Sequence, residues 1–167
     1  MIFNQIFLEG PYTIDLEKKE DFRGSFTRTF DKEIFKKYDI DFDIVQTSIS
    51  ENVKKNILRG MHYQDKPFEE DKIVHCIRGS IYDVILDIRE GSPTKDKWQA
   101  LMLNDNCLLY IPRGFAHGYQ TLESNTSVLY YMNEFYHPEC AKTIHYMDTK
   151  YKIRWMFENP IMSDKDR

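Results

Sequence analysis

Two histidines lie in strand-like segments where histidine is unusual. His62 stands in the stretch NILRGMHYQD, with Arg59 three residues before it and an aromatic residue directly after it, and His117 stands in IPRGFAHGY. Such a histidine can be a hydrogen-bonded core residue, a metal ligand or an acid–base group, since imidazole changes protonation state near neutral pH. Each of the two has an arginine and a glycine nearby, which disfavours a plain core role for both.

A metal site is weakly supported by the residues around these histidines. The PxGxxH pattern at residues 112–117 resembles the second motif of the cupin jelly rolls. A stable metal site needs about three or four converging ligands. In the first motif, however, His62 is followed by Tyr63 and Gln64, so the HxH pair of metal-binding cupins is absent. We therefore predict no metal at these histidines.

Other polar residues occur where a plain β core would be apolar. In YDVILDIRE, the alternation of a strand places Asp83, Ile85 and Asp87 on one face. Lys72 begins the segment KIVHCIRG, and Tyr130 lies between apolar residues in SVLYYM. Each has an ordinary explanation, Lys72 as a solvated strand end and Tyr130 as a core aromatic. Together with histidine they form the set needed to move a proton next to a carbonyl group.

The elements that must position these residues are mostly short strands. Aromatic residues make up 14% of the chain and cluster with Val, Ile and Thr, which favours a pleated, half-buried surface. One short helix is predicted in DKEIFKKYD, with Asp31 as its N-cap and Ile34, Phe35 and Tyr38 on one face. The predicted strands are Tyr12 to Leu16, Phe42 to Ser48, Asn56 to His62, Lys72 to Ile77, Ser80 to Ile88, Trp98 to Leu103, Cys107 to Ile111, Gly118 to Leu122, Ser127 to Met132 and Thr143 to Tyr146.

Length and composition indicate a single all-β domain over residues 1–167, because no repeat or linker divides the chain. Many short strands at this spacing suggest a jelly-roll barrel with a few short peripheral helices. The formal net charge of −4 and the lack of a long apolar run argue against nucleic-acid and membrane partners. Three widely separated cysteines without a CxxC pair, and no signal peptide, favour a cytoplasmic location.

Six stretches in this order resemble the dTDP-4-dehydrorhamnose 3,5-epimerase family. They are DFRGSF, NILRGMHYQ, KIVHCIRGSIYDVILDIREGSPT, IPRGFAHGYQTL, LYYMNEFYHP and PIMSDKD, and they span about Asp21 to Asp166. The resemblance implies a cupin-like jelly-roll homodimer that uses neither metal nor redox cofactor. Its substrate would be a nucleotide-diphosphate 4-keto sugar, used in making a deoxysugar or related sugar for surface polysaccharide.

The resemblance also implies roles for the residues around the ketone. His62 matches the general base, Asp166 the carboxylate that pairs with it, and Tyr130 the general acid on the opposite face of the sugar ring. Lys72 and His117 match residues beside the ketone and sugar, where a cation would stabilise an enolate. The base would remove a proton next to the carbon 4 ketone, and return of a proton to the other face would invert carbon 5, carbon 3 or both.

A second group of residues is expected to bind the rest of the substrate. By resemblance, the residues at the phosphates or sugar are Arg23, Arg59 and Lys165, and those around the nucleotide are Phe26, Gln46 and Tyr136. We add Asp83, from the acidic face described above, to the substrate-binding residues.

Three positions depart from the family pattern: Arg28 replaces a glutamate, Thr47 and Ser48 follow Gln46 where QxN is usual, and Ala141 replaces another glutamate. All three lie on the nucleotide side. An arginine offers only hydrogen-bond donors, which would suit the acceptor edges of cytosine or guanine. Alternatively, Arg28 swings outward or binds a phosphate. The carrier could therefore be dTDP, CDP or GDP.

Two other functions fit the same barrel. A 3,4-ketoisomerase would move the carbonyl group instead of inverting a centre, and a non-catalytic sugar-nucleotide-binding barrel would need no acid–base pair. The combination of His62, Tyr130 and Asp166 favours the epimerase.

Overall fold

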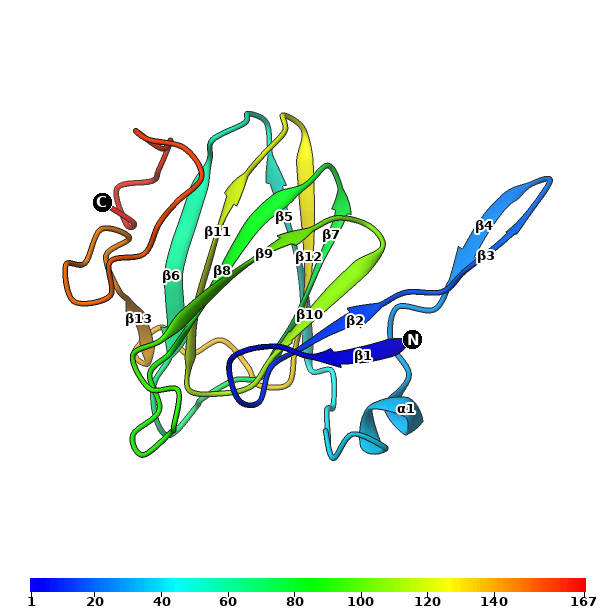
Figure 1. Cartoon of the computed structure of the whole chain (residues 1–167), viewed down its shortest axis with the longest axis horizontal. Coiled ribbons are helices and arrows are strands. Elements are labelled where there is room, and N and C mark those ends of the chain that lie inside the picture. The colour runs from blue at the N-terminus through cyan, green and yellow to red at the C-terminus, as the bar shows by residue number, and fades with distance from the viewer.

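The computed structural model describes residues 1–167 and consists of thirteen strands and one short helix (Figure 1). The strands are β1 (Ile2–Gln5), β2 (Tyr12–Asp15), β3 (Lys18–Asp21), β4 (Gly24–Thr27), β5 (Gln46–Asn52), β6 (Leu58–Gln64), β7 (Lys72–Arg78), β8 (Ile81–Asp87), β9 (Trp98–Leu103), β10 (Cys107–Ile111), β11 (Phe115–Thr121), β12 (Thr126–Met132) and β13 (Ala141–Thr143), and the helix is α1 (Lys32–Lys36). The all-β prediction is confirmed, but only one helix is present where several were expected.

Two antiparallel sheets face each other around the main core. One has the order β1-β2-β10-β7-β12-β5 and the other the order β13-β6-β11-β8-β9 (Figure 1). Apolar side chains from both sheets meet between them, among them Val74, Ile85, Leu109, Phe115 and Val128. The two sheets remain separate hydrogen-bonded units, so this cupin-like jelly roll is a sandwich and not a closed barrel.

Strand alternation decides which residues enter the space between the sheets. On β8, Ile81 and Ile85 belong to the main core, so Asp83 points inward with them. Val84 and Leu86 point to the other side, where they pack in a separate cluster with Met61. The predicted division of this strand into an acid-containing face and an apolar face is therefore confirmed.

The helix α1 seals the outer side of the first sheet. The Asp31 carboxylate accepts from the backbone N–H groups of Glu33 and Ile34, which confirms it as the N-cap. The Phe35 side chain is fully buried in a second core cluster, with Phe42 beside it. Residues 42–45, predicted as part of a strand, form none, and the strand in this region is β5.

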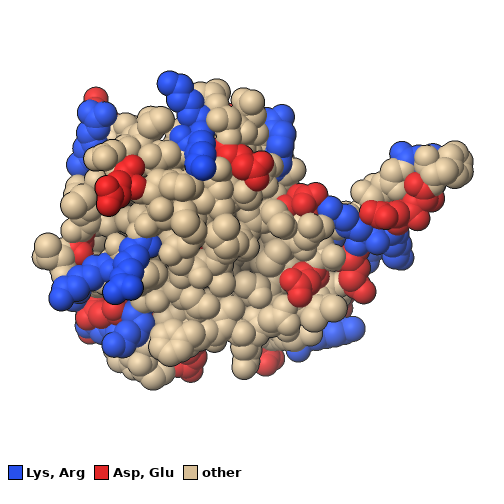
Figure 2. Space-filling model, turned by 45° about the horizontal axis from the view of Figure 1, so that its top comes forward, with Lys and Arg blue, Asp and Glu red and all other residues tan.

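A two-stranded arm, formed by β3 and β4, projects away from the two sheets (Figure 1). It was not predicted, because β3 has the sequence KKED and shows no apolar alternation. Figure 2 shows closely mixed positive and negative side chains along this arm, whereas a broad part of the visible face of the body carries no charge.

Two further features concern membrane-spanning helices and the state of the cysteines. No helix in the structure is both long and apolar enough to cross a membrane. The three cysteines are all free thiols.

Candidate active site

The inner face of β6 carries His62, whose ring is hydrogen-bonded to a carboxylate from the end of the chain. The His62 Nε2 atom lies 2.6 Å from Asp166 Oδ1. A turn holds Asp166 in place, because its backbone N–H donates to the Ser163 carbonyl and the Ser163 hydroxyl donates to its second oxygen. The Asp166 side chain is 5% exposed and that of His62 is 37% exposed. The structure thus brings together two residues that are 104 positions apart.

The protonation of His62 suits a base. Burial lowers the pKa of its imidazole, and the hydrogen bond and charge of Asp166 offset part of this shift. A neutral imidazole beside a carboxylate must donate from Nε2, which leaves the lone pair on Nδ1. That nitrogen is the atom able to accept a proton from a substrate.

A second imidazole–carboxylate pair lies on the neighbouring strands. His117 on β11 is the register partner of His62, and residues directly opposite in a sheet point to the same side. The His117 Nε2 atom lies 2.8 Å from Asp83 Oδ2. Asp83 has no exposed surface, and it therefore cannot make the substrate contact that we predicted for it. The Asp83 carboxylate instead orients the His117 ring through this hydrogen bond.

Glycines allow the two histidine strands to approach each other. Gly60 has a φ of +121°, and a Cβ atom built on it would lie 2.5 Å from the Gly118 Cα atom. A larger residue at this position would therefore push β6 away from β11. The RGMH and AHGY segments supply these glycines beside their histidines.

The opposite sheet contributes Tyr130 and Lys72. Tyr130 on β12 packs against the main core, and its ring lies 6.0 Å from that of His117 in an edge-on arrangement. Tyr130 pairs with Val74 on β7, and Lys72 is two residues from Val74 on the same face. Burial raises the pKa of Tyr130 well above its usual value, with smaller contributions from Tyr119 and Asp83. The phenol consequently keeps its proton at neutral pH.

Lys72 is buried, so the alternative explanation as a solvated strand end is wrong. Its Nζ atom donates to Glu70 Oε1 over 2.6 Å, and the side chains are 8% and 13% exposed, respectively. A buried ammonium group needs such a partner, because leaving it unpaired in a low-dielectric interior is costly. Glu70 lies in the loop before β7. It was not predicted, because a loop sequence has no periodicity that indicates which way a side chain points.

Four of the predicted substrate-binding residues lie on the two sheets or in the segments next to them. The Arg59 Nε atom donates to Asn52 Oδ1 over 2.9 Å. The Gln46 side chain accepts from the backbone N–H of Tyr136 over 2.6 Å, which brings two predicted nucleotide-binding residues together. Lys165 is exposed, and its charge is close enough to His62 to lower the imidazole pKa.

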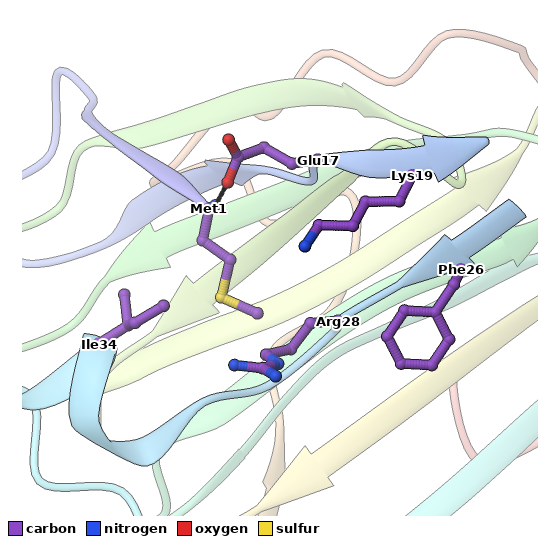
Figure 3. Close-up of a pocket in the computed structure, with 6 residues that line it drawn as sticks. All are labelled: Met1, Glu17, Lys19, Phe26, Arg28 and Ile34. Atoms are coloured by element: carbon purple, nitrogen blue, oxygen red, sulfur yellow. Dashed lines mark hydrogen bonds and ion pairs between the residues drawn. The ribbon is translucent and has the colours of Figure 1, made fainter.

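The other three predicted binding residues lie on or next to the arm, away from His62. Arg23 pairs with Asp21, while the Phe26 side chain remains largely exposed. The Arg28 Nη1 atom donates to Asp31 Oδ2 over 2.6 Å, so its guanidinium already has a carboxylate partner. A cavity of about 320 Å³ at the base of the arm is lined by Met1, Glu17, Lys19, Phe26, Arg28 and Ile34 (Figure 3). Within one chain, these residues do not join the two histidines.

Tyr119 and Asn52 are two inward-facing residues that the sequence analysis missed. Tyr119 lies two positions after His117 on the same strand face, and this spacing was a usable signal. The Asn52 Nδ2 atom donates to the Tyr119 hydroxyl over 3.0 Å. No group of three or more His, Cys, Asp or Glu side chains is arranged to hold a metal ion.

Comparison with known proteins agrees with this arrangement. The family model described as dTDP-4-dehydrorhamnose 3,5-epimerase matches residues 5–167. The dTDP-4-dehydrorhamnose 3,5-epimerase of Shigella flexneri is 36% identical over 168 residues, covering 98% of this chain and 92% of that protein. The protein of the same name from Methanothermobacter thermautotrophicus is 37% identical, with 99% and 91% covered.

Two solved structures are similar over nearly the whole chain. The dTDP-4-dehydrorhamnose 3,5-epimerase of Bacillus anthracis, solved with TDP and PPi bound, gives a TM-score of 0.96 at 31% identity and covers 99% of this chain and 96% of that one. The dTDP-6-deoxy-D-glucose-3,5-epimerase of Legionella pneumophila, in complex with dTDP-4-keto-L-rhamnose, gives a TM-score of 0.93 at 32% identity, with 99% and 89% covered.

Proposed function

Because this chain belongs to the dTDP-4-dehydrorhamnose 3,5-epimerase family, we propose that His62 and Tyr130 invert carbon 3, carbon 5 or both of a dTDP-linked 4-keto sugar. The chain is accordingly an isomerase of deoxysugar synthesis. One observation carries the assignment of the two residues: the base candidate and the acid candidate lie on opposite sheets and point into the space between them. A sugar ring between the sheets would therefore present one face to each.

The first half of the reaction falls to His62. Its Nδ1 atom takes the proton from the carbon next to the ketone, and Asp166 stabilises the imidazolium that forms. The ketone oxygen becomes an enolate oxygen, and positive charge near it lowers the barrier. Lys72 supplies that charge from the facing sheet, with Glu70 fixing the position of its ammonium group.

The second half falls to Tyr130. Its phenol returns a proton to the same carbon from the opposite side, which inverts the centre. The raised pKa of Tyr130 keeps the proton available until the enolate forms, and makes the phenolate a strong base afterwards. His117 packs edge-on against the Tyr130 ring, so it limits how far this acid can move.

The dTDP carrier is supported by the family description and by the TDP and dTDP-4-keto-L-rhamnose present in the two solved relatives. Of the cations expected at the diphosphate, Lys165 lies near His62, and Arg59 lies on the same strand as His62 with its guanidinium bound to Asn52. The Gln46–Tyr136 pair offers one wall for the nucleotide. The three free thiols fit a reducing compartment, and we propose that the enzyme works in the cytoplasm.

We further propose a homodimer in which the arm serves the site of the second copy. Phe22 and Phe26 are 98% and 72% exposed on the arm, which is unusual for large apolar side chains with no covering element. The arm also carries Arg23, which the family resemblance assigns to the phosphates or sugar. Docking of the arm on a second copy would cover the aromatic rings and complete that site.

The reaction is tested by incubating the protein with a dTDP-linked 4-keto-6-deoxy sugar in D₂O and recording NMR spectra. We expect deuterium at each inverted carbon and the ketone still at carbon 4. A ketone moved to carbon 3 would indicate a ketoisomerase, and binding without deuterium incorporation would indicate a non-catalytic barrel. Either result would refute the proposal.

The shared site is tested by mixing two inactive variants, His62→Ala and Arg23→Ala. Random reassociation makes half of the dimers mixed, and each mixed dimer would hold one complete site, so about a quarter of the activity should return. Mixed dimers without activity would show that the arm serves its own chain.

A further inference from the structure

The charge of Arg59 has no carboxylate partner in the protein. Six of the eight arginines form an ion pair with Asp or Glu, and Arg59 is not among them. Its one hydrogen bond within the protein runs from Nε to Asn52 Oδ1, over 2.9 Å. The residue is exposed, and both Nη groups are without a protein partner. These two groups are therefore available to an anionic ligand.

A bulge in β6 turns Arg59 to the same side as His62. Residues three positions apart point to opposite faces of a regular strand. On β6, however, His62 lies opposite His117 and Arg59 lies opposite Tyr119, so three steps along β6 match two steps along β11. The extra residue of the bulge lets both side chains face the space between the sheets.

Asn52 reaches Arg59 from the other sheet. It is the last residue of β5, lies opposite Thr126 on β12 and is 1% exposed. Its Nδ2 group donates to the backbone carbonyls of Ser50 and Thr126 over 3.1 and 3.2 Å. Because a carbonyl oxygen only accepts, the NH₂ end of the amide must face these two carbonyls. The Oδ1 atom is thereby directed toward Arg59.

The Tyr119 hydroxyl supports the same amide from β11. It accepts from Asn52 Nδ2 over 3.0 Å and donates to Asn52 Oδ1 over 3.3 Å. The Oδ1 atom thus accepts from both Arg59 and Tyr119, which uses both of its lone pairs. Asn52 is consequently too buried and too fully bonded to contact a substrate, and any effect it has on a ligand must pass through Arg59.

We propose that Asn52 is a positioning residue for the diphosphate: it holds Arg59 Nε so that the two Nη groups bind phosphate oxygens as a pair. This inference rests on the proposed function, in which Arg59 belongs to the diphosphate site. With Nε occupied, the donors that remain form the fork that matches two oxygens of one phosphate. An arginine that is fixed before binding also loses less side-chain freedom when the ligand arrives.

The inference is tested by measuring dTDP binding to Asn52→Ala by calorimetry. We expect its Kd to rise roughly three- to tenfold, because the ligand must now order the Arg59 side chain. The kcat at saturating substrate should stay near that of the unmodified protein, since His62, Asp166 and Tyr130 keep their contacts. A lower kcat with unchanged dTDP affinity would show that Asn52 supports the core and not the diphosphate site, and would overturn the inference.

Asn4→Ala is the matched control for this substitution. Asn4 lies on β1, at the opposite edge of the same sheet from β5, and its side chain donates to Asp15. The control should bind dTDP like the unmodified protein. Should Asn52→Ala fail to fold, Asn52→Ser takes its place with the same expectation, because its hydroxyl can still bond a buried carbonyl but ends short of Arg59.

A double-mutant cycle with Arg59→Ala separates a positioning role from a general structural one. Arg59→Ala should weaken dTDP binding, and adding Asn52→Ala to it should weaken binding no further, because Asn52 acts through Arg59. Additive losses would overturn the inference, as would a loss in Arg59→Ala with none in Asn52→Ala. Unchanged dTDP affinity in Arg59→Ala would also remove Arg59 from the diphosphate site of the proposed function.

Discussion

Replacing Asp166 by asparagine removes the charge beside the proposed base while keeping its shape. The asparagine amide can still meet His62 Nε2 and the Ser163 hydroxyl, which now hold the carboxylate. What is lost is the attraction between a carboxylate and the imidazolium that forms on proton capture. The variant therefore separates the electrostatic role of Asp166 from its role in positioning the ring.

The expected loss of rate follows from the exposure of the two partners. A hydrogen bond to a charged group contributes roughly 1.5–3 kcal/mol. Asp166 is buried, but the His62 ring is 37% exposed and partly screened by water, which favours the lower end. A loss of about 1.5 kcal/mol lowers the rate about tenfold. We expect this loss on the pH-independent part of the kcat profile.

The pH profile gives an independent test, namely the direction in which its acid limb moves. Proton abstraction requires neutral His62, so kcat/KM rises with pH through the pKa of this residue in the free enzyme. Burial lowers that pKa and Asp166 raises it, so without the carboxylate the pKa falls further. The acid limb of Asp166→Asn should therefore move to lower pH. In Lys165→Ala it should move to higher pH, because the charge of Lys165 lowers the same pKa.

The assay is a pH series of initial rates, with Asp164→Asn as the control. This substitution makes the same chemical change two residues away, on a side chain that is 98% exposed and paired only with Arg167. We expect the control to match the unmodified protein. An acid limb that moves to higher pH in Asp166→Asn, or an unchanged plateau rate, would refute the pairing of Asp166 with the catalytic base.

Three further predictions concern the rest of the site. Lys72→Ala should lower turnover by about two to three orders of magnitude, as loss of an oxyanion-stabilising group does, and a loss below tenfold would remove Lys72 from the mechanism. Treatment with a chelator should leave activity unchanged, whereas stoichiometric zinc or iron that tracks with activity would contradict the metal-free reaction. Because Asp31 already holds the Arg28 guanidinium, calorimetry should show tighter binding of dTDP than of CDP or GDP. Tighter binding of CDP or GDP would instead support base reading by Arg28.

The strands of the two sheets were largely predictable because their sequences alternate. The ranges of β9 and β10 agree with the prediction at both ends, since turn residues bound each strand. The arm was not predictable in this way. Its β3 strand is entirely exposed and charged, so burial leaves no pattern in the sequence.

The site could be predicted in its residues more than in its contacts. The motifs around His62 and His117 indicated acid–base chemistry, and alternation indicated that Asp83 points inward. How deeply each side chain is buried was not predictable. Asp83 was expected to contact the substrate, but it is completely buried and holds His117 instead. The partner of Lys72 was hidden for a related reason, because Glu70 lies in a loop where no periodicity fixes side-chain direction.

Solvent deuterium incorporation, measured together with inversion in the His62→Ala and Tyr130→Phe variants, tests the central claim most directly. Base and acid act in sequence on opposite faces of the sugar. Loss of His62 should therefore abolish exchange of the hydrogen next to the ketone. Loss of the Tyr130 hydroxyl should slow inversion more than exchange, because the enolate still forms and returns to the starting sugar. Undiminished exchange in His62→Ala would contradict the account.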